Sequence, residues 1–250
     1  MRISLNGMVS SDEDVEIYRY FGYDAFSPQT VRQALADNPA GEELVLEINS
    51  PGGSVMAGSE IYSVLRSAGN IPIRAEVQSL AASAASYLML GCGQVWMSPV
   101  AQVMIHLPTT YTEGDETAHR AGMQMLETIR ESILNAYELK AGGRTSRAEF
   151  RRLMEANTWM TAQEAVERGL ADGILYQEEP IPQNVVNAVR GGIRALGGSG
   201  GMPNIAQLRM QFQRQKQAQT GGVPGADNWG EQAKARLALE KIRFIGGSYT

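Results

Sequence analysis

Two serines lie in a run of small residues that could present a nucleophile. Ser83 and Ser86 fall within Leu80–Met89, which follows an alternating, strand-like run at Ile73–Val77. We expect the small-residue run to form a helix, whose first turn exposes unpaired N–H groups and the positive end of the helix dipole. A serine there could attack a carbonyl carbon beside donors for the resulting oxyanion. The same residues would also allow an ordinary helix to pack closely, so this run alone leaves both interpretations open.

A nucleophilic serine needs a base, and the sequence contains two histidines, His106 and His119. His106 ends the apolar run 102–106, which we expect to be a strand. His119 stands among charged residues at the polar start of a helix, where solvent would surround it. His106 is therefore the better candidate for a base, although a histidine that ends a strand is more often a structural, hydrogen-bonded residue.

A glycine-containing loop follows the apolar strand Leu44–Ile48. The segment is Asn49–Val55, in which Pro51 fixes φ and Gly52 and Gly53 permit a left-handed backbone or a close approach. Such a motif alone is usually only a turn. Its place between a buried strand and a helix is where α/β proteins put backbone that binds ligands.

The elements that would carry these residues predict an α/β fold with mostly parallel strands. Ser27 and Pro28 begin one helix, and Thr161 with Glu164 forms a capping box for another. Glu116–Ala141 has apolar residues at helical spacing and predicts a long helix. The resulting order of strands and helices is β-α-β-α-β-β-α-α-α-β, which is typical of α/β architecture.

Composition limits the classes of function. The 250 residues include one cysteine, Cys92, so no internal disulfide can form, and no cysteine and histidine cluster has metal-site spacing. We expect neither a metal nor another cofactor. No apolar run approaches the roughly 18 residues that a membrane span needs, and the start lacks the features of a signal peptide, so we expect a cytoplasmic protein that does not bind membranes.

The charge is distributed unevenly along the chain. The net charge is −5 overall, and residues 181–250 hold nine basic and three acidic residues, which leaves −11 for residues 1–180. The acidic part argues against nucleic-acid binding by the main domain. We expect a globular domain at residues 1–180 and a flexible, basic, Gly/Gln-rich extension at 181–250. Within this extension Ile205, Leu208 and Phe212 could form a short amphipathic helix on a partner.

Three segments together resemble the Clp-type serine peptidases. They are Asn49–Gly53, the expected helix start Ala81–Ser83, and Val103–His106. By the runs Leu80–Ser86, Met104–His106 and Thr158–Glu167, the chain is most similar to the bacteriophage branch, the Clp-like head maturation proteases. The resemblance covers about residues 2–176. It implies a ClpP/crotonase-like fold of repeated strand-strand-helix units, a protruding long helix and a homo-oligomeric ring.

The resemblance also implies a catalytic site. It makes Ser83 the nucleophile, His106 the general base, and the backbone N–H groups of Gly53 and Ala84 the oxyanion hole. A serine hydroxyl needs a base for its proton and donors for the tetrahedral oxyanion, so the residue types agree with these roles. Ser86 is the fallback nucleophile.

The third catalytic position departs from the family pattern. The motif places the family's acidic residue at Asn157, where this chain has an amide. An amide can accept the His106 N–H but cannot stabilise the imidazolium by charge. Three possibilities follow: a Ser-His-Asn site, replacement by Glu155 or another carboxylate, or impaired catalysis. We expect weak but real activity through Ser83.

The first expected strand begins at Arg2, so we expect no preceding segment of the kind that forms axial loops for an unfoldase. The main expectation is therefore an ATP-independent serine endopeptidase that cleaves capsid or scaffold protein during phage head maturation, in the host cytoplasm or procapsid. The alternatives are the proteolytic subunit of an ATP-dependent Clp-type protease, an acyl-CoA enzyme of the crotonase fold, and a catalytically impaired assembly or scaffold protein.

Overall fold

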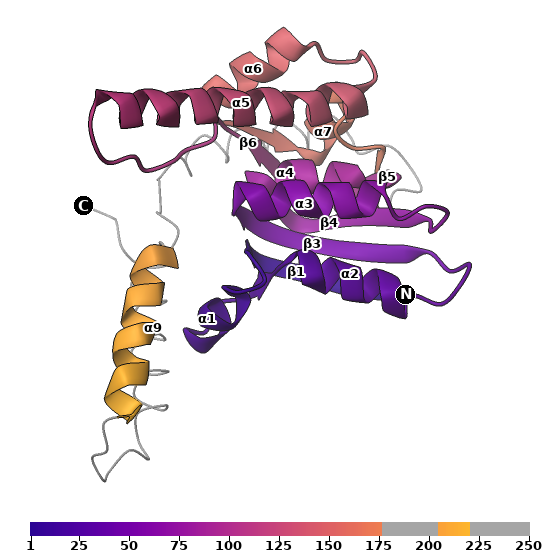
Figure 1. Cartoon of the computed structure of the whole chain (residues 1–250). Coiled ribbons are helices and arrows are strands. Elements are labelled where there is room, and N and C mark those ends of the chain that lie inside the picture. Colours follow the sequence, from indigo (N-terminus) through magenta and orange to yellow (C-terminus); the bar gives the residue numbers. More distant parts are fainter. Residues whose placement is uncertain (177–204, 221–250) are drawn as a thin grey trace, which may run out of the picture.

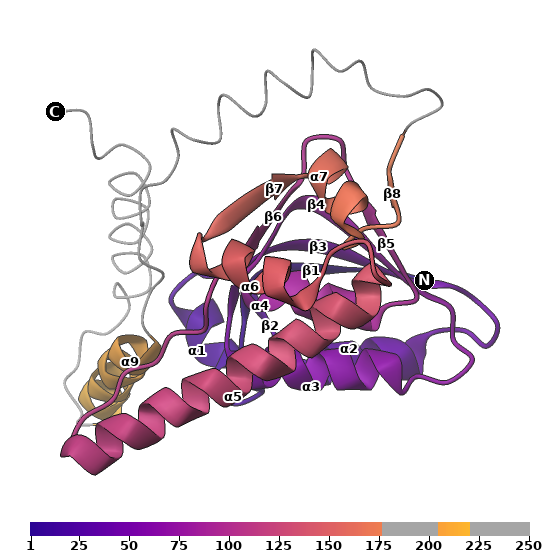
Figure 2. The ribbon, with the colours of Figure 1, turned by 90° about the horizontal axis from the view of Figure 1, so that it is seen from above.

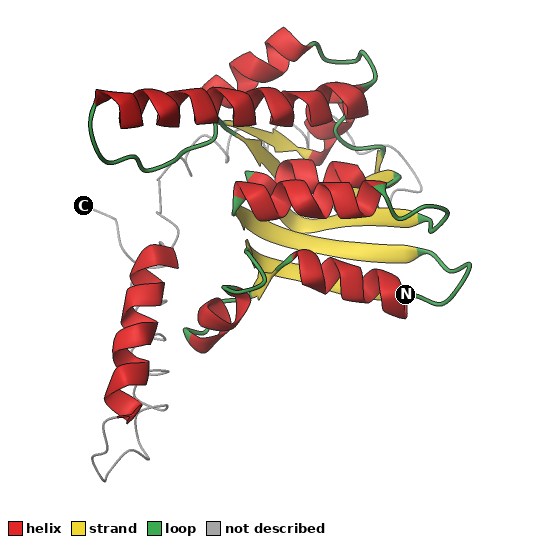
Figure 3. Cartoon of the chain, in the orientation of Figure 1, coloured by secondary structure: helices red, strands yellow, loops and turns green. Residues whose placement is uncertain are grey.

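The structure, a computed structural model, describes residues 1–176 and 205–220. A central sheet alternates along the chain with helices (Figures 1 and 3). The α/β prediction is confirmed. Of the extension at 181–250, residues 181–204 and 221–250 lie outside the described residues, so its expected flexibility is not tested.

The described residues form one sheet, in which the strands β2-β1-β3-β4-β5-β8 lie side by side and are all parallel. The second half of β4 also pairs with β6 in parallel, and β6 pairs with β7 in the antiparallel sense. The strands span Arg2–Val9 (β1), Ala25–Phe26 (β2), Leu44–Gly53 (β3), Ile73–Ala82 (β4), Gln94–Met97 (β5), Gln102–Ile105 (β6), Thr158–Thr161 (β7) and Gly173–Ile174 (β8).

The helices span Val15–Tyr20 (α1), Pro28–Asp37 (α2), Val55–Arg66 (α3), Ala84–Leu88 (α4), Glu116–Ala141 (α5), Arg147–Glu155 (α6), Ala162–Arg168 (α7) and Ile205–Thr220 (α9), with a short 3₁₀ turn at Met89–Gly91. Helices α2 and α3 lie side by side along the sheet (Figure 2). The core lies beneath them, where Leu44, Leu46 and Ile48 of β3 are fully buried.

Helix α5 is the protruding long helix that the family resemblance implies. Its second half is anchored in the core by Ile133, Leu134 and Tyr137, and the Tyr137 ring packs on that of Phe150 with centroids 5.4 Å apart. In its first half Gly122 is the one buried residue, so this half extends away from the sheet (Figure 2). None of the helices in the described ranges is long and apolar enough to cross a bilayer.

Two parts of the structure differ from the sequence prediction. The helix expected at Leu80–Met89 begins only at Ala84, because Leu80, Ala81 and Ala82 complete β4 and pair with β6. The segment between β1 and α2, for which the sequence predicts no element, forms α1 and β2. In the first case pairing with β6 decides the local structure; in the second, β2 pairs with β1 and α1 packs against α9, and a local pattern contains none of these contacts.

Candidate active site

Ser83 stands at a sharp turn between β4 and α4. Its φ is 53° and its ψ is −121°, a conformation that non-glycine residues rarely adopt and that costs roughly 1–3 kcal/mol. The Ser83 N–H donates to the Met104 carbonyl at 2.8 Å, which holds the turn against β6. The adjoining strand therefore maintains a strained backbone that presents the Ser83 side chain at the carboxyl end of β4.

His106 reaches Ser83 because β4 and β6 are parallel neighbours. Ala82 pairs with Met104, so the residues that directly follow these two strands meet at the same edge of the sheet. His106 Nε2 lies 2.7 Å from Ser83 Oγ, which is hydrogen-bond distance. His106 is half-buried, and this burial lowers its pKa from the ordinary value of 6.5. A neutral imidazole at neutral pH can accept the serine proton.

The glycine loop at the end of β3 packs directly on Ser83. A Cβ on Gly52 would lie 2.6 Å from Ser83 Cβ and 2.7 Å from the Ala82 carbonyl oxygen, so the contact requires glycine. The next residue, Gly53, is exposed and pairs in register with Val9 of β1. Ala84 is the first residue of α4, so its N–H belongs to the first-turn donors that have no acceptor within the helix.

Asn157 lies at the turn between α6 and β7, and its φ is 50°. In the antiparallel ladder Ile105 pairs with Thr158, so the next position of that register places Asn157 opposite His106. Asn157 is exposed, and no hydrogen bond joins its side chain to His106 within the described part of the chain. Glu155 forms an ion pair with Arg151 at 3.1 Å on the exposed face of α6.

The other candidates from the sequence lie away from this chemistry. Ser86 is fully buried, and its Oγ donates to the Ser83 carbonyl at 2.6 Å and lies 2.6 Å from the Tyr137 hydroxyl. His119 is exposed on α5, where its Nδ1 lies 2.9 Å from Thr112 Oγ1. The structure therefore brings Ser83, His106 and the glycine loop together and leaves Ser86 and His119 in other roles.

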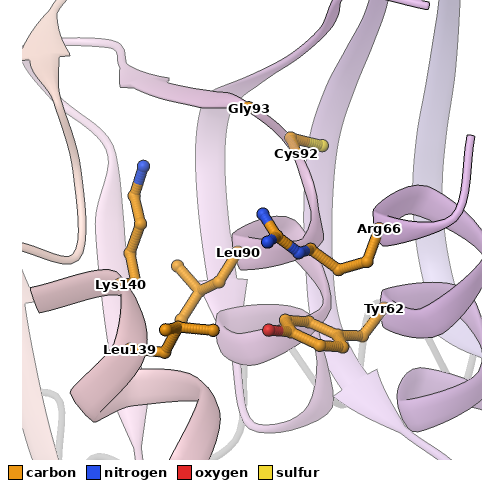
Figure 4. Close-up of a pocket in the computed structure, with 7 residues that line it drawn as sticks. All are labelled: Tyr62, Arg66, Leu90, Cys92, Gly93, Leu139 and Lys140. Atoms are coloured by element: carbon orange, nitrogen blue, oxygen red, sulfur yellow. The ribbon is translucent and has the colours of Figure 1, made fainter. Parts of the chain in front are cut away.

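A cavity of about 220 Å³ lies apart from these residues, between α3, the 3₁₀ turn and the end of α5 (Figure 4). It is lined by Tyr62, Arg66, Leu90, Cys92, Gly93, Leu139 and Lys140. Burial raises the pKa of the Cys92 thiol to about 12, so the thiol stays protonated and is a poor nucleophile. Residues 1–176 and 205–220 contain no cluster of His, Cys, Asp and Glu that could hold a metal ion.

Comparison with known proteins gives one family. The profile of the Clp protease family matches residues 23–178. The chain is 37% identical over 146 residues to the ATP-dependent Clp protease proteolytic subunit 1 of Chlamydia abortus, covering 56% of this chain and 72% of that protein. It is 31% identical over 184 residues to the subunit 1 of Protochlamydia amoebophila (72% and 82% of the two chains). It is 32% identical over 143 residues to the proteolytic subunit of Ligilactobacillus salivarius (56% and 71%).

Proposed function

The chain belongs to the Clp protease family and is a serine peptidase, and we propose that it cleaves peptide bonds through an acyl-enzyme on Ser83, with His106 as the base. The observation that carries this assignment is the 2.7 Å distance between Ser83 Oγ and His106 Nε2 at a strained turn. Membership of the Clp protease family argues against an acyl-CoA enzyme of the crotonase fold, whose chemistry does not need Ser83 and His106 as a pair.

The distance between Ser83 and His106 supports the following reaction. His106 Nε2 takes the proton of Ser83 Oγ as that oxygen attacks the peptide carbonyl carbon. The tetrahedral oxyanion forms beside the N–H groups of Gly53 and Ala84, which we propose as its donors. His106 then gives the proton to the leaving amine, and the C–N bond breaks. Water attacks the resulting ester in the same manner and releases the acid and free Ser83.

The carboxylate that would stabilise the His106 imidazolium is absent at position 157. The position opposite His106 holds an amide, and that amide forms no hydrogen bond with the imidazole within residues 1–176 and 205–220. Glu155 forms an ion pair with Arg151, which argues against Glu155 as a replacement for the missing carboxylate at position 157. We therefore propose that Ser83 and His106 hydrolyse peptides at a reduced rate, and that the protein is not an inert scaffold. Asn157 belongs to the site but supplies no negative charge to His106.

The working assembly that we propose is a ring of identical subunits that act as the proteolytic component of a cytoplasmic Clp-type protease. The relatives named above are proteolytic subunits of ATP-dependent Clp proteases, and none of those three names refers to a capsid. These names favour a proteolytic subunit of a Clp-type protease over the head maturation protease that we expected from the sequence. Addition of a Clp unfoldase with ATP should then accelerate degradation of a folded protein substrate.

Head maturation remains a second candidate, because the runs at Leu80–Ser86 and Thr158–Glu167 resemble the phage branch. In this case the protein would cleave capsid or scaffold protein without ATP, and an unfoldase would have no effect. The two candidates therefore differ in one assay, in which a folded substrate and a scaffold protein are each incubated with and without unfoldase and ATP.

The catalytic assignment is tested by peptide hydrolysis. Ser83→Ala should lower kcat by about 10³-fold or more, because the nucleophile is lost. Ser86→Ala is the matched control, since Ser86 is buried one helical turn away, and it should keep most of the activity. Unchanged hydrolysis by Ser83→Ala would overturn the proposal.

A further inference from the structure

A small apolar cluster lies outside the main core, on the segment between β1 and α2. Its buried members on this segment and on β1 are Met8, Tyr18, Phe21 and Ala25. With the carboxylate of Asp14 they form one surface, which we call the α1 platform. The platform combines an apolar patch with one buried acidic group, Asp14.

Helix α9 covers the α1 platform with one face. Ile205, Leu208 and Phe212 follow a spacing of three and four residues, which places them on the same side of a helix. Leu208 is buried among the platform side chains, and the other two are partly buried against them. The Phe212 ring meets the Tyr20 ring edge to face with centroids 5.0 Å apart. Figure 1 shows α9 beside α1.

The ion pair between Asp14 and Arg209 favours a helix that carries a basic residue. Asp14 is only 6% exposed. Arg209 donates two hydrogen bonds to its carboxylate, from Nε to Oδ1 at 2.7 Å and from Nη2 to Oδ2 at 2.8 Å. The carboxylate also accepts from Ser11 Oγ at 2.8 Å, and it forms no cap to α1. A buried carboxylate is costly without a partner, and a planar guanidinium satisfies it in two-point geometry. An apolar helix without arginine would leave the Asp14 carboxylate with the Ser11 hydroxyl but without a cation.

We propose that the α1 platform is a docking site for an amphipathic helix that presents arginine next to leucine, and that its occupant is α9 of the same chain. The chain has 29 residue steps between Tyr176 and Ile205, which span up to about 100 Å when extended. A domain of this size is about 40 Å across, so the chain is long enough for α9 to dock on its own domain.

Docking places α9 against α1, which directly follows a strand of the sheet that carries Ser83. Met8 of the platform and the adjacent Val9 pair in register with Gly52 and Gly53. The Val9 carbonyl also accepts the Ser54 N–H at 2.8 Å. Asp14 follows Val9 by five residues, which is at most about 19 Å of chain. The docked α9 is thus connected to the glycine loop through α1 and β1, and its docking does not depend on the proposed catalytic roles.

Amide hydrogen exchange of the full-length chain tests the docking. Arg209→Ala should increase exchange by about tenfold in peptides that cover α9 and α1, because it removes a charge-assisted pair from a buried carboxylate. Arg214→Ala is the matched control, since Arg214 is exposed on the same helix and has no ion pair in the described residues; it should leave exchange unchanged. The combined variant Asp14→Lys with Arg209→Asp should restore part of the protection. Equal effects of Arg209→Ala and Arg214→Ala would overturn the proposal.

Cross-linking identifies the occupant. The double variant Tyr20→Cys with Phe212→Cys should be joined by a short bis-maleimide, which spans the space that the two rings fill, and the product should migrate as a single chain. Tyr20→Cys with Met210→Cys is the control, because Met210 is exposed, and it should cross-link more slowly. A cross-linked dimer would show that a second copy supplies α9, and equal rates for the two pairs would show that α9 does not dock; each result contradicts the proposal.

Discussion

His106 and Asn157 take opposed positions where the β6–β7 ladder ends. The ladder pairs Ile105 with Thr158, so the next pair in the antiparallel register joins the proposed base to an asparagine. Cα atoms of opposed residues in such a ladder are about 4.5–5.5 Å apart, yet no hydrogen bond connects these two side chains in the described chain. The site therefore has a position from which an acid could stabilise the imidazolium, but the residue there carries no charge.

Asn157→Asp should raise the activity. A carboxylate opposite His106 would orient the imidazole and stabilise its charged form, and the loss of such a group lowers kcat by about 10⁴-fold in a well-studied triad. Because Asn157 is exposed, we expect a smaller gain in kcat, of about 10-fold to 10²-fold, with KM unchanged. Steady-state hydrolysis of a short peptide measures this gain in kcat. Glu155→Gln serves as the control and should have no effect, and an unchanged kcat for Asn157→Asp would show that position 157 does not act on the base.

The pH dependence should follow the burial of His106. Burial lowers the pKa of His106 below 6.5, and only the neutral imidazole can accept the Ser83 proton. Hence kcat/KM should rise with pH through an inflection below 6.5 and stay level above pH 7. In Asn157→Asp the new negative charge favours the imidazolium, so the inflection should move to higher pH. An inflection above 7 in the unmodified protein would contradict a desolvated His106.

Gly52→Ala should disrupt the site by a clash rather than by strain alone. Gly41 and Gly52 both have left-handed φ values, 81° and 98°, but an added Cβ meets nothing within 4 Å at Gly41 and lies 2.6 Å from Ser83 Cβ at Gly52. We expect Gly41→Ala to cost about 1–2 kcal/mol through backbone strain. Gly52→Ala should cost about 1–3 kcal/mol more and abolish hydrolysis. Denaturant unfolding gives the free energy of unfolding of the two variants. Equal losses would show that Gly52 is not in close contact with Ser83.

Ser86 should prove to be a structural residue. It donates to the Ser83 carbonyl, so its oxygen is left to accept from the Tyr137 hydroxyl, which is fully buried and whose pKa burial raises. Ser86→Ala leaves that hydroxyl without a partner and should cost about 1–3 kcal/mol, whereas Tyr137→Phe removes one hydrogen bond and should cost about 1 kcal/mol. Urea unfolding measures both values. A smaller cost for Ser86→Ala than for Tyr137→Phe would argue against this network.

Local signals were sufficient for much of the fold. The caps at Ser27 and Thr161 and the helix Glu116–Ala141 occur as predicted, because each depends on residues within a few positions of one another. Strand β7 and the pair α1 and β2 were not anticipated. Strand β7 exists because it pairs with β6, and α1 lies under a helix that begins almost two hundred residues later.

The site was predictable in its residue types but not in its geometry. Ser83 was singled out from a small-residue run at an expected helix start and His106 from the end of an apolar strand, and the family resemblance implied their roles. The structure brings them together because β4 and β6 are parallel neighbours. The positive φ of Ser83 had no signal in the sequence, since the Met104 carbonyl on another strand helps to hold that turn. The burial of Ser86 depends on Tyr137, 51 residues away, which no local pattern contains.

The most direct test of the account is covalent labelling with a serine-directed fluorophosphonate, followed by mapping of the modified peptide by mass spectrometry. We predict one adduct on Ser83, which is lost in Ser83→Ala, slowed in His106→Ala and retained in Ser86→Ala. An adduct on Ser86, or labelling of the unmodified protein that persists in Ser83→Ala, would contradict the claim that Ser83 and His106 form the catalytic pair.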